Sequence, residues 1–591
     1  MNRAAVLVSW LLPAVALAFA LLALAGSLVS YGWLVGVAAR FSNGGGADAV
    51  SLGQFESIIL RLRLASAVAV PLLLALVAGR RWVAGALAAY FGHLRPAPPS
   101  PLGLVAFWRN EPLAALVLVG ITGFGMGVAG WFLAQPMRYD EAWTFTSFVR
   151  MPAYLIPLRY NVPNNHVLNT LLIKLATTLL GDEPQVIRLP AYLYGALLAP
   201  AGFFLTRRLF GSGAGLLAAA LVATASPLVE FSTNARGYTA ICFYFLVMLS
   251  AGHVAVERRS PAGWTVAVAA GALGAYTIPV MAIPAAIAFL WFAGLATTAA
   301  SDRAARLREV IGAGLALAVV VALLYAPIVA VNGPSALTAN EGMKPDARVG
   351  ELVLQLPGFS ASVWSIWTRD YPPVLAWGLS LCALVFPLGP GRRQGVLLLG
   401  AALAVVVLYM LAVADLGYFR VWLFLLPLFL CFSAAGLAVA LRQPGPRLAA
   451  GLSVALALVL GADVLSRGSV KASTETGIFP AAREVVEDLS RHLSSGDMVA
   501  SDRNAAAPLI YYAARRGLDL RPAETRDDVR YFVHGGAAAP GRRLFLVVNP
   551  SPSCRPAEVL ASAIGRAGMV AGGLEPFVQE DGYSLLAAPL R

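Results

Sequence analysis

The amino-acid sequence predicts a predominantly α-helical polytopic membrane protein with a soluble α/β domain at its C-terminal end. Of its 591 residues, 59% are apolar and 13% are charged, and its mean hydropathy is +0.72. A soluble chain of this length would need more charge to cover its surface. Many separate apolar runs also reach the roughly 20 residues that cross about 30 Å of hydrocarbon. After residue 466 these runs end and shorter amphipathic segments begin.

We expect about thirteen membrane-spanning helices. Their apolar cores, in chain order, are residues 6–30, 64–79, 112–134, 186–206, 212–229, 237–256, 262–276, 279–298, 310–331, 373–389, 395–414, 419–440 and 448–465. The first run resembles a signal peptide, but it is longer than the usual apolar part of one, so we expect an uncleaved span. The run 167–180 is apolar but short, and we expect an interfacial helix there.

Basic residues set the expected orientation, because arginine and lysine gather on the cytoplasmic side of membrane proteins. When the spans are counted alternately, most arginine pairs fall on one side, whereas Arg40, Arg61 and Arg63 do not. The opposite side then carries residues 135–185, 230–236, 332–372, 415–418 and those after about 466. We therefore expect a multi-pass protein of the inner (cytoplasmic) membrane whose C-terminal domain faces the periplasm or exterior. The net charge of +13 reflects these loop charges, and no nucleic-acid partner is expected.

Three regions follow from this organisation. Residues 1–105 hold two additional spans and a cytoplasmic linker, residues 106–466 the main membrane domain with its outer loop 135–185, and residues 467–591 the soluble domain. In the soluble domain we expect helices over 480–493 and 506–516, another helix from 556, and strands over 498–501, 543–548 and 583–587. The four cysteines show no metal-binding spacing.

A glycine-rich segment, residues 125–130, matches the fingerprint of dinucleotide-binding proteins. It lies inside an apolar span, with no preceding strand and no acidic residue at the required distance. We therefore interpret it as a small-residue seam for close helix packing, formed by Gly123 and Gly127.

Polar residues on the expected outer side gather at the ends of spans. They are Arg138, Tyr139, Asp140, Glu141 and Trp143 after the span 112–134, Asn164, Asn165 and His166 before the interfacial helix, Arg236 and Tyr238 between two spans, and Tyr418 and Arg420 before another. Each group alone has a structural explanation. Asp140 can cap a helix over 141–149, Asn164 or Asn165 can cap the interfacial helix, and arginines beside hydrocarbon can snorkel. Their shared side and depth favour one common site.

Such a site is suited to transfer from a membrane-bound phosphodiester. A carboxylate beside apolar surface can remove the proton of an acceptor hydroxyl. Arginines and a histidine can bind a phosphate and stabilise the charge that it gains as a leaving group. Tyr139 and Trp143 offer faces for sugar stacking, or anchor the protein in the aromatic belt of the membrane.

Motifs within residues 110–440 resemble those of the GT-C membrane glycosyltransferases, most closely the dolichyl-phosphate-mannose protein mannosyltransferases and the aminoarabinose transferases of lipid A. They are the acidic pair Asp140–Glu141, the Asn/His-led helix, and residues 187–190 (Ile-Arg-Leu-Pro), 234–238 (Asn-Ala-Arg-Gly-Tyr) and 276–277 (Tyr-Thr). The resemblance implies a GT-C-like catalytic domain. It also implies an inverting transfer from a polyprenyl-phosphate sugar, on the extracytoplasmic side, to a hydroxyl of a lipid, glycan or protein.

The resemblance implies residue roles as well. Asp140 is the expected base and Glu141 a supporting acid. The residues expected at the donor phosphate are His166, Arg236, Arg420 and Arg138, and those expected at the substrates are Tyr139, Trp143, Asn164, Asn165, Tyr238, Tyr276 and Tyr418. Asn165 stands where many relatives carry an acid, so the family's second-acid role and any metal use are in question. No cofactor is expected, although a divalent metal stays open.

A transporter or flippase for polyprenyl-linked sugars or lipids is the alternative function. Transporters carry polar or broken helices near the bilayer midplane, whereas here the spans are apolar at their centres and polar groups gather at the outer boundary. A scaffold without activity would leave that shared placement unexplained.

Overall fold

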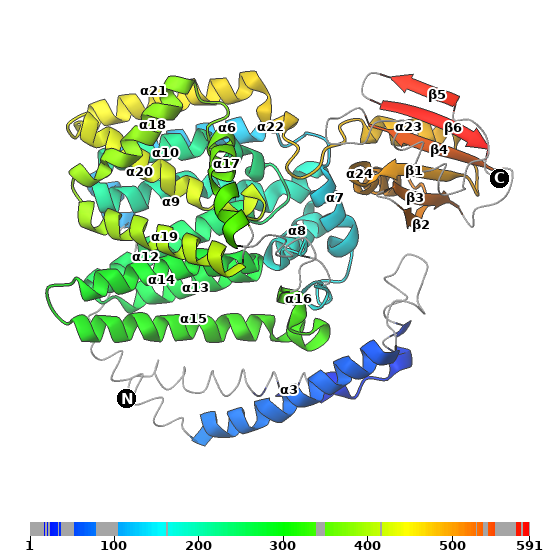
Figure 1. Cartoon of the computed structure of the whole chain (residues 1–591), viewed down its shortest axis with the longest axis horizontal. Helices are drawn as coiled ribbons and strands as arrows, with labels where there is room; N and C mark the ends of the chain where they lie inside the picture. Colours follow the sequence, from blue (N-terminus) through cyan, green and yellow to red (C-terminus); the bar gives the residue numbers. More distant parts are fainter. Residues whose placement is uncertain are drawn as a thin grey trace.

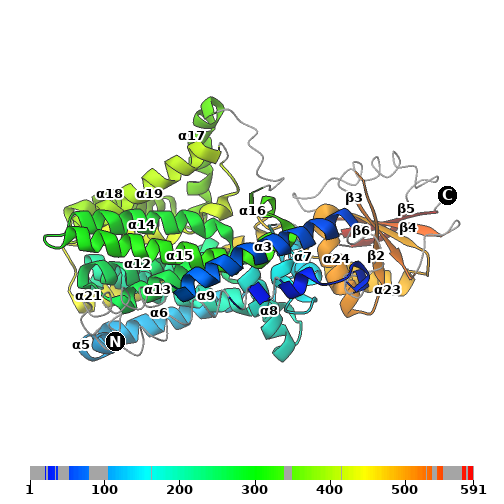
Figure 2. The ribbon, with the colours of Figure 1, turned by 90° about the horizontal axis from the view of Figure 1, so that it is seen from below.

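The computed structural model of the protein describes residues 52–78, 104–160, 163–338, 349–413, 416–526, 529–535, 542–549, 575–580 and 583–589, with scattered positions between 17 and 36. Helices form an elongated bundle, and a mixed β-sheet with two helices lies beyond one end of it (Figures 1 and 2). The predicted class, a helical membrane protein with a C-terminal α/β domain, is confirmed.

The bundle is built from apolar helices. They are α3 (Leu52–Ala78), α5 (Leu104–Asn110), α6 (Pro112–Gly130), α9 (Pro184–Phe210), α10 (Ser212–Thr224), α11 (Ser226–Ser232), α12 (Tyr238–Arg258), α13 (Pro261–Thr277), α14 (Ala282–Thr297), α15 (Arg303–Asn332), α17 (Val349–Trp367), α18 (Pro373–Val385), α19 (Arg392–Val413), α20 (Leu425–Ala440) and α21 (Pro446–Arg467). In the described part of the chain, seven spans are long and apolar enough to cross a membrane. The pair α10–α11, bent by 59°, makes up to eight.

The count of thirteen spans stays a prediction. Among the described helices, α18 and α20 are apolar but shorter than the seven candidate spans, and most of the predicted first span lies outside the described residues. Helix α17 was missed, because the sequence predicts a loop over 332–372. Pro357 interrupts the apolar run of this helix, and proline inside a helix is rare.

Short elements cover the end of the bundle nearest the sheet (Figure 2). They are α7 (Tyr139–Thr144), the π-helix η1 (Phe145–Val149), the 3₁₀-helix η2 (Ile156–Leu158), α8 (Val167–Leu180), α16 (Ser335–Thr338), the 3₁₀-helix η6 (Phe419–Trp422) and α22 (Ser469–Ala472). Helix α8 has the bounds that the sequence predicts, and its interfacial position stays a prediction. At the opposite end, Arg207 of α9 pairs with Glu111, and Arg259 pairs with Glu309 of α15.

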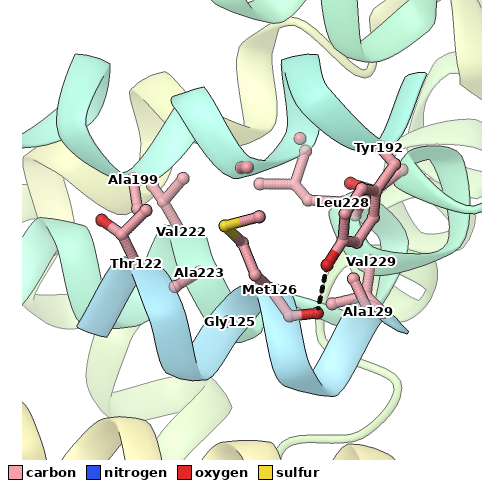
Figure 3. A pocket seen from close by; sticks show the side chains of 13 residues that line it. Thr122, Gly125, Met126, Ala129, Tyr192, Ala199, Val222, Ala223, Leu228 and Val229 are labelled. Carbon is pink, nitrogen blue, oxygen red and sulfur yellow. Dashed lines mark hydrogen bonds between the residues drawn. The ribbon is translucent and has the colours of Figure 1, made fainter. Parts of the chain in front are cut away.

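The glycine-rich segment of α6 packs against α10 through Gly125. A Cβ atom at Gly125 would lie 2.9 Å from the Cβ of Ala223, whereas one at Gly123 or Gly127 would meet nothing within 4 Å. The predicted seam is therefore assigned to the wrong residues. Position 125 lies about 200° around the helix from position 123, so the two cannot share a face. A small cavity of about 20 Å³ lies beside Gly125 between α6, α9 and α10 (Figure 3).

The C-terminal domain has one six-stranded sheet in the order β2-β3-β1-β4-β6-β5. Its elements are α23 (Ala482–His492), β1 (Met498–Asp502), α24 (Arg503–Arg515), β2 (Leu520–Arg526), β3 (Val529–His534), β4 (Arg543–Val548), β5 (Glu575–Glu580) and β6 (Tyr583–Pro589). Strands β1 and β4 are parallel, and the other pairs are antiparallel. The predicted helices α23 and α24 and strands β1, β4 and β6 are present, whereas β2, β3 and β5 were missed. The helix predicted from residue 556 lies outside the described residues.

The α/β domain and the bundle share a hydrophobic cluster. Met137 and Phe145 from the bundle join Phe479 and Tyr511 from the domain side in this cluster, and all four are buried. The rings of Phe145 and Tyr511 meet edge to face at 5.5 Å, and the backbone N–H of Met137 donates to the hydroxyl of Tyr512 at 3.2 Å. The domain is therefore packed against α7 and η1 rather than tethered at a distance.

Candidate active site

Asp140 lies in the first turn of α7, at the end of the bundle that faces the α/β domain. Its side chain is partly exposed, and its carboxylate has no hydrogen-bond or ion-pair partner among the described residues. Its backbone is fixed, because its N–H donates to the carbonyl of Thr476 and its carbonyl accepts from the side chain of Asn164, both at 3.1 Å. The backbone of Asp140 is thus fixed, while its carboxylate is available to accept a hydrogen bond or a proton.

Glu141, the next residue, is in a different environment. It is fully buried, and its carboxylate pairs with the buried guanidinium of Arg188 from α9. It also accepts the backbone N–H groups of Arg138 at 2.8 Å and of Ala235 at 3.0 Å. Glu141, not Asp140, is therefore the carboxylate that caps α7. It joins α7, α9 and the loop before α12.

Arg138 is also buried, and its guanidinium is surrounded by acceptors. It donates to Glu230 of α11 at 3.4 Å and to the carbonyl of Ser473 at 2.9 Å, as well as to the carbonyl of Val470. Glu230 in turn accepts from Arg369 at 2.7 Å. Because its donors are engaged in this network, Arg138 lies behind α7 as a structural support and is not open to a phosphate.

His166 and Arg236 form the centre of a cationic cluster. His166 is 2% exposed and Arg236 3%, and His166 Nε2 lies 2.9 Å from a terminal nitrogen of Arg236. The N–H of Gly237 donates to His166 Nδ1 at 2.8 Å, so the neutral ring carries its proton on Nε2. Burial lowers the pKa of His166 well below 6.5, and the charges of Arg236 and Arg420 lower it further. A neutral ring then faces its N–H toward another donor, which favours an anion that accepts hydrogen bonds from both.

The remaining donors of Arg236 define how it is held. One terminal nitrogen donates to the hydroxyl of Thr144 at 2.8 Å and to the carbonyl of Asn164 at 2.7 Å. Its Nε is buried and has no hydrogen-bond partner among the described residues. In that part of the chain, no carboxylate forms an ion pair with Arg236. Its charge is therefore available to a bound anion.

Arg420 completes the cluster from η6. Burial lowers its pKa, but the neighbouring Tyr238, Asp140 and Glu475 more than offset this effect and raise it. Its guanidinium donates to the carbonyl of Glu475 at 2.6 Å and lies 4.2 Å from the centre of the Tyr418 ring, a cation–π contact. Arg420 therefore lies near enough to interact with the charges of both Asp140 and His166.

The predicted polar and aromatic residues divide into two sets. Asn164 and Tyr238 lie in the site, since Asn164 holds both Asp140 and Arg236, and the Tyr238 ring packs edge to face on His166 at 5.2 Å. Asn165 is buried and ties its own loop, donating to the carbonyls of Ile156 and Arg159 at 2.9 and 2.8 Å. Neither asparagine caps α8, which has no side-chain cap.

The predicted stacking residues lie at the edges of the site. Tyr139 and Trp143 stack on each other with ring centres 6.0 Å apart, and both pack against the cluster shared with the α/β domain. The ring of Tyr276 meets that of Tyr325 at 6.2 Å, beside the buried Tyr160. These contacts leave the faces of Tyr139 and Trp143 partly occupied by protein.

Several residues of the site were missed from the sequence. They are Thr144, Tyr160, Glu230, Arg369, Glu475 and Thr476. Tyr160 lies near Arg236, and burial raises its pKa to about 12. Glu475 lies near Arg420; burial raises the pKa of its carboxyl, and Glu230 adds to this effect. Glu230 could have been found from the sequence, because an acid beside an apolar run indicates a buried or functional charge. Thr476 lies among other polar residues, and nothing in the sequence distinguishes it from them.

Across the described ranges, no group of three or more His, Cys, Asp and Glu side chains is placed to hold a metal ion.

A family model matches the centre of the chain. The model described as dolichyl-phosphate-mannose-protein mannosyltransferase matches residues 166–326, which is less than a third of the sequence. The matched segment begins at His166 and contains Arg236, Tyr238 and Tyr276. No curated protein sequence matches the chain.

Three solved structures are distantly similar to the chain. The oligosaccharyltransferase of Archaeoglobus fulgidus, in complex with zinc and sulfate, is 16% identical with a TM-score of 0.43 over 64% of this chain and 56% of that one. ArnT from Cupriavidus metallidurans, bound to undecaprenyl phosphate, is 13% identical with a TM-score of 0.39 over 79% and 97%. The arabinosyltransferase EmbB from Mycobacterium smegmatis is 13% identical with a TM-score of 0.33 over 88% and 49%.

These structural similarities are loose, and the chain spans little more than half the length of the oligosaccharyltransferase. The family match is the stronger finding, because it includes His166 and Arg236, the centre of the cationic cluster. The chain is therefore a multi-pass membrane protein that resembles the GT-C glycosyltransferases, and over residues 166–326 it matches the dolichyl-phosphate-mannose-protein mannosyltransferase family.

Proposed function

We propose that this protein is an inverting glycosyltransferase that moves a sugar from a polyprenyl-phosphate carrier to an acceptor hydroxyl. One observation supports the proposal above all others. The carboxylate of Asp140 is near enough to Arg420 to raise its pKa, and among the described residues neither Asp140 nor the buried Arg236 of the neighbouring cationic cluster has an ion-pair partner. A base and a phosphate-binding cluster side by side are what this reaction requires.

The reaction is a single displacement. Asp140 accepts the proton of the acceptor hydroxyl while that oxygen bonds to the anomeric carbon of the sugar. The bond from the anomeric carbon to the phosphate oxygen breaks, and its electron pair leaves with the phosphate. Arg236 and Arg420 neutralise the added charge, and charge-assisted hydrogen bonds of this kind are the strong ones. His166 donates its Nε2–H to the same phosphate. Attack opposite the leaving group inverts the anomeric configuration.

The setting supports a lipid-linked donor. The cluster is formed by loops at the ends of apolar helices, so a polyprenyl tail has hydrocarbon beside it. We place the site on the extracytoplasmic side of the cytoplasmic membrane, because the arginine-rich loops at the other end of the bundle have the charge typical of a cytoplasmic face. The acceptor hydroxyl belongs to a lipid, a glycan or a protein.

The test uses purified protein in liposomes with a panel of labelled polyprenyl-phosphate hexoses, pentoses and amino sugars. We expect one donor to be consumed with release of polyprenyl phosphate, and the product to have the opposite anomeric configuration by NMR. Movement of the lipid across the bilayer without loss of its sugar would instead identify a flippase.

Asp140→Asn keeps the size of the side chain but removes the base. We expect it to lose more than about a hundredfold in kcat, the scale of a general base, with normal expression because its carboxylate makes no hydrogen bond within the described residues. The matched control is Asp302→Asn, an exposed position at the far end of the bundle whose left-handed backbone (φ 58°) asparagine tolerates. Wild-type activity in Asp140→Asn would refute the assignment.

A further inference from the structure

The segment between the bundle and the α/β domain crosses the candidate active site. We call residues 473–479 the strap. Three of its backbone carbonyls accept hydrogen bonds from site residues. Glu475 accepts from Arg420 at 2.6 Å, Thr476 from the N–H of Asp140 at 3.1 Å, and Gly477 from the N–H of Tyr139 at 3.0 Å.

These contacts matter because α7 is short. It has six residues, and isolated helices of this length are unstable. Its first N–H groups have no partner within the helix, and Tyr139 and Asp140 are its first two residues. The strap carbonyls supply those partners, so the position of Asp140 depends on the strap.

Thr476 connects the strap to the cationic cluster. It is 2% exposed, and its hydroxyl accepts from the side-chain amide of Asn234 at 2.8 Å. Asn234 is fully buried and precedes Arg236 by two residues. Thr476 therefore contacts Asp140 of α7 through its carbonyl, and through its hydroxyl it contacts Asn234, in the loop that carries Arg236.

The other end of the strap is held by the α/β domain. The carbonyl of Ile478 accepts from Asn549 at 3.1 Å, and Phe479 is 1% exposed in the cluster shared by the bundle and the domain. Docking of the α/β domain against the bundle therefore also sets the position of the strap.

We infer that Thr476 is a positioning residue for the transfer reaction, and that the strap makes the α/β domain part of the active site by fixing Asp140 relative to Arg236 and Arg420. The inference rests on the proposed function. It gives the C-terminal domain a role in assembling the chemistry, independent of any part in binding the acceptor.

The test compares three variants of the full chain. Thr476→Val removes the hydroxyl at constant shape, Thr476→Ser keeps it, and Thr474→Val makes the same change at an exposed strap position. We expect Thr476→Val to lower kcat by about 10- to 100-fold, the scale of a misplaced catalytic group, with less than a twofold change in donor KM. Thr476→Ser and Thr474→Val keep wild-type kcat. A wild-type kcat in Thr476→Val, or an equal loss in Thr476→Ser, would overturn the inference.

A second measurement is independent of turnover. Hydrogen–deuterium exchange of the peptide containing α7 is expected to be faster in Thr476→Val than in Thr474→Val, and equal exchange would also overturn the inference. If the wild type consumes no donor, the proposed function fails while the exchange data still judge the strap. If Thr476→Val yields no folded protein, Thr476→Cys replaces it with the same expectations, and rates are expressed per folded protein after size-exclusion chromatography.

Discussion

Glu141 and Arg188 form an ion pair in which both side chains are fully buried, one residue away from Asp140, which is partly exposed and has no ion-pair partner among the described residues. The two adjacent acids therefore have separate tasks. Glu141 faces into the protein and holds α7, α9 and the loop before α12 together, while the partly exposed Asp140 takes no part in this network. Neighbouring carboxylates on a short helix point in different directions, so one is solvated and the other is neutralised by protein donors.

The first prediction concerns this ion pair. Glu141→Gln turns an amide N–H₂ toward donors from Arg138, Arg188 and Ala235, and it leaves the Arg188 charge buried. Breaking a buried pair in this way costs about 3–5 kcal/mol, so we expect a lower unfolding temperature and a reduced yield. Glu183→Gln is the matched control, because Glu183 pairs with Arg515 at an exposed position and such pairs contribute about 1 kcal/mol or less. Equal unfolding temperatures for the two variants would contradict this interpretation.

The second prediction concerns Arg236. Arg236→Ala removes a buried cation, and we expect kcat/KM for the donor to fall about a hundredfold, the loss typical of one charge-stabilising donor. Arg236→Lys keeps the charge without the planar fork, and an intermediate loss is expected. Arg308→Ala, at an exposed position of α15, serves as the control. If donor dependence is unchanged in Arg236→Ala, the phosphate does not bind there.

The third prediction is a pH dependence of stability. Burial and the charges of Arg236 and Arg420 lower the pKa of His166 below 6.5, so in acid the unfolded chain binds a proton that the folded protein does not. The stability linked to His166 is therefore present above about pH 6.5 and is lost as the pH falls. We expect the unfolding temperature of the wild type to fall more steeply from pH 7 to 5 than that of His166→Gln. His492→Gln, at an exposed site, should keep the wild-type slope; a wild-type slope in His166→Gln would disprove the linkage.

The fourth prediction tests helix packing in the membrane. Gly125→Ala places a methyl group 2.9 Å from the Cβ of Ala223 and 3.1 Å from its carbonyl oxygen, so we expect a lower unfolding temperature. Gly127→Ala meets nothing within 4 Å and gains up to about 1 kcal/mol of helix propensity, so its unfolding temperature should be equal or higher. The reverse order would place the close contact at the other glycine.

The sequence predicts those helices and strands that a local pattern of apolar and polar residues encodes. Long apolar runs predict α9, α12 and α15, and a short apolar run flanked by polar residues predicts the bounds of α8. The buried strand β4 follows from its continuous apolar residues. Strand β5 was missed because most of its residues are exposed, so it has no apolar pattern to read.

The sequence predicts which residues of the site lie on the same side of the membrane. Asp140, His166, Arg236 and Arg420 end spans on one side; in the structure His166 and Arg236 lie 2.9 Å apart, and Arg420 lies near enough to interact with the charges of both Asp140 and His166. The separate environments of Asp140 and Glu141 were not predictable, since they depend on Arg188, which is 47 residues further along the chain. The engagement of Arg138 likewise depends on Glu230, 92 residues away. Sequence position assigns such groups to a face of the membrane but does not give the distance between them.

The strap also sets the order in which the parts of the candidate active site come together during synthesis. Arg138 bonds to Thr476, 338 residues later in the chain, so the ribosome delivers the acidic pair long before the carbonyls that fix it. The backbone N–H groups of Tyr139 and Asp140 gain their partners only after Gly477 and Thr476 have been translated and the strap has folded onto α7. The placement of the acidic pair is thereby timed by a segment that is translated 338 residues after Arg138.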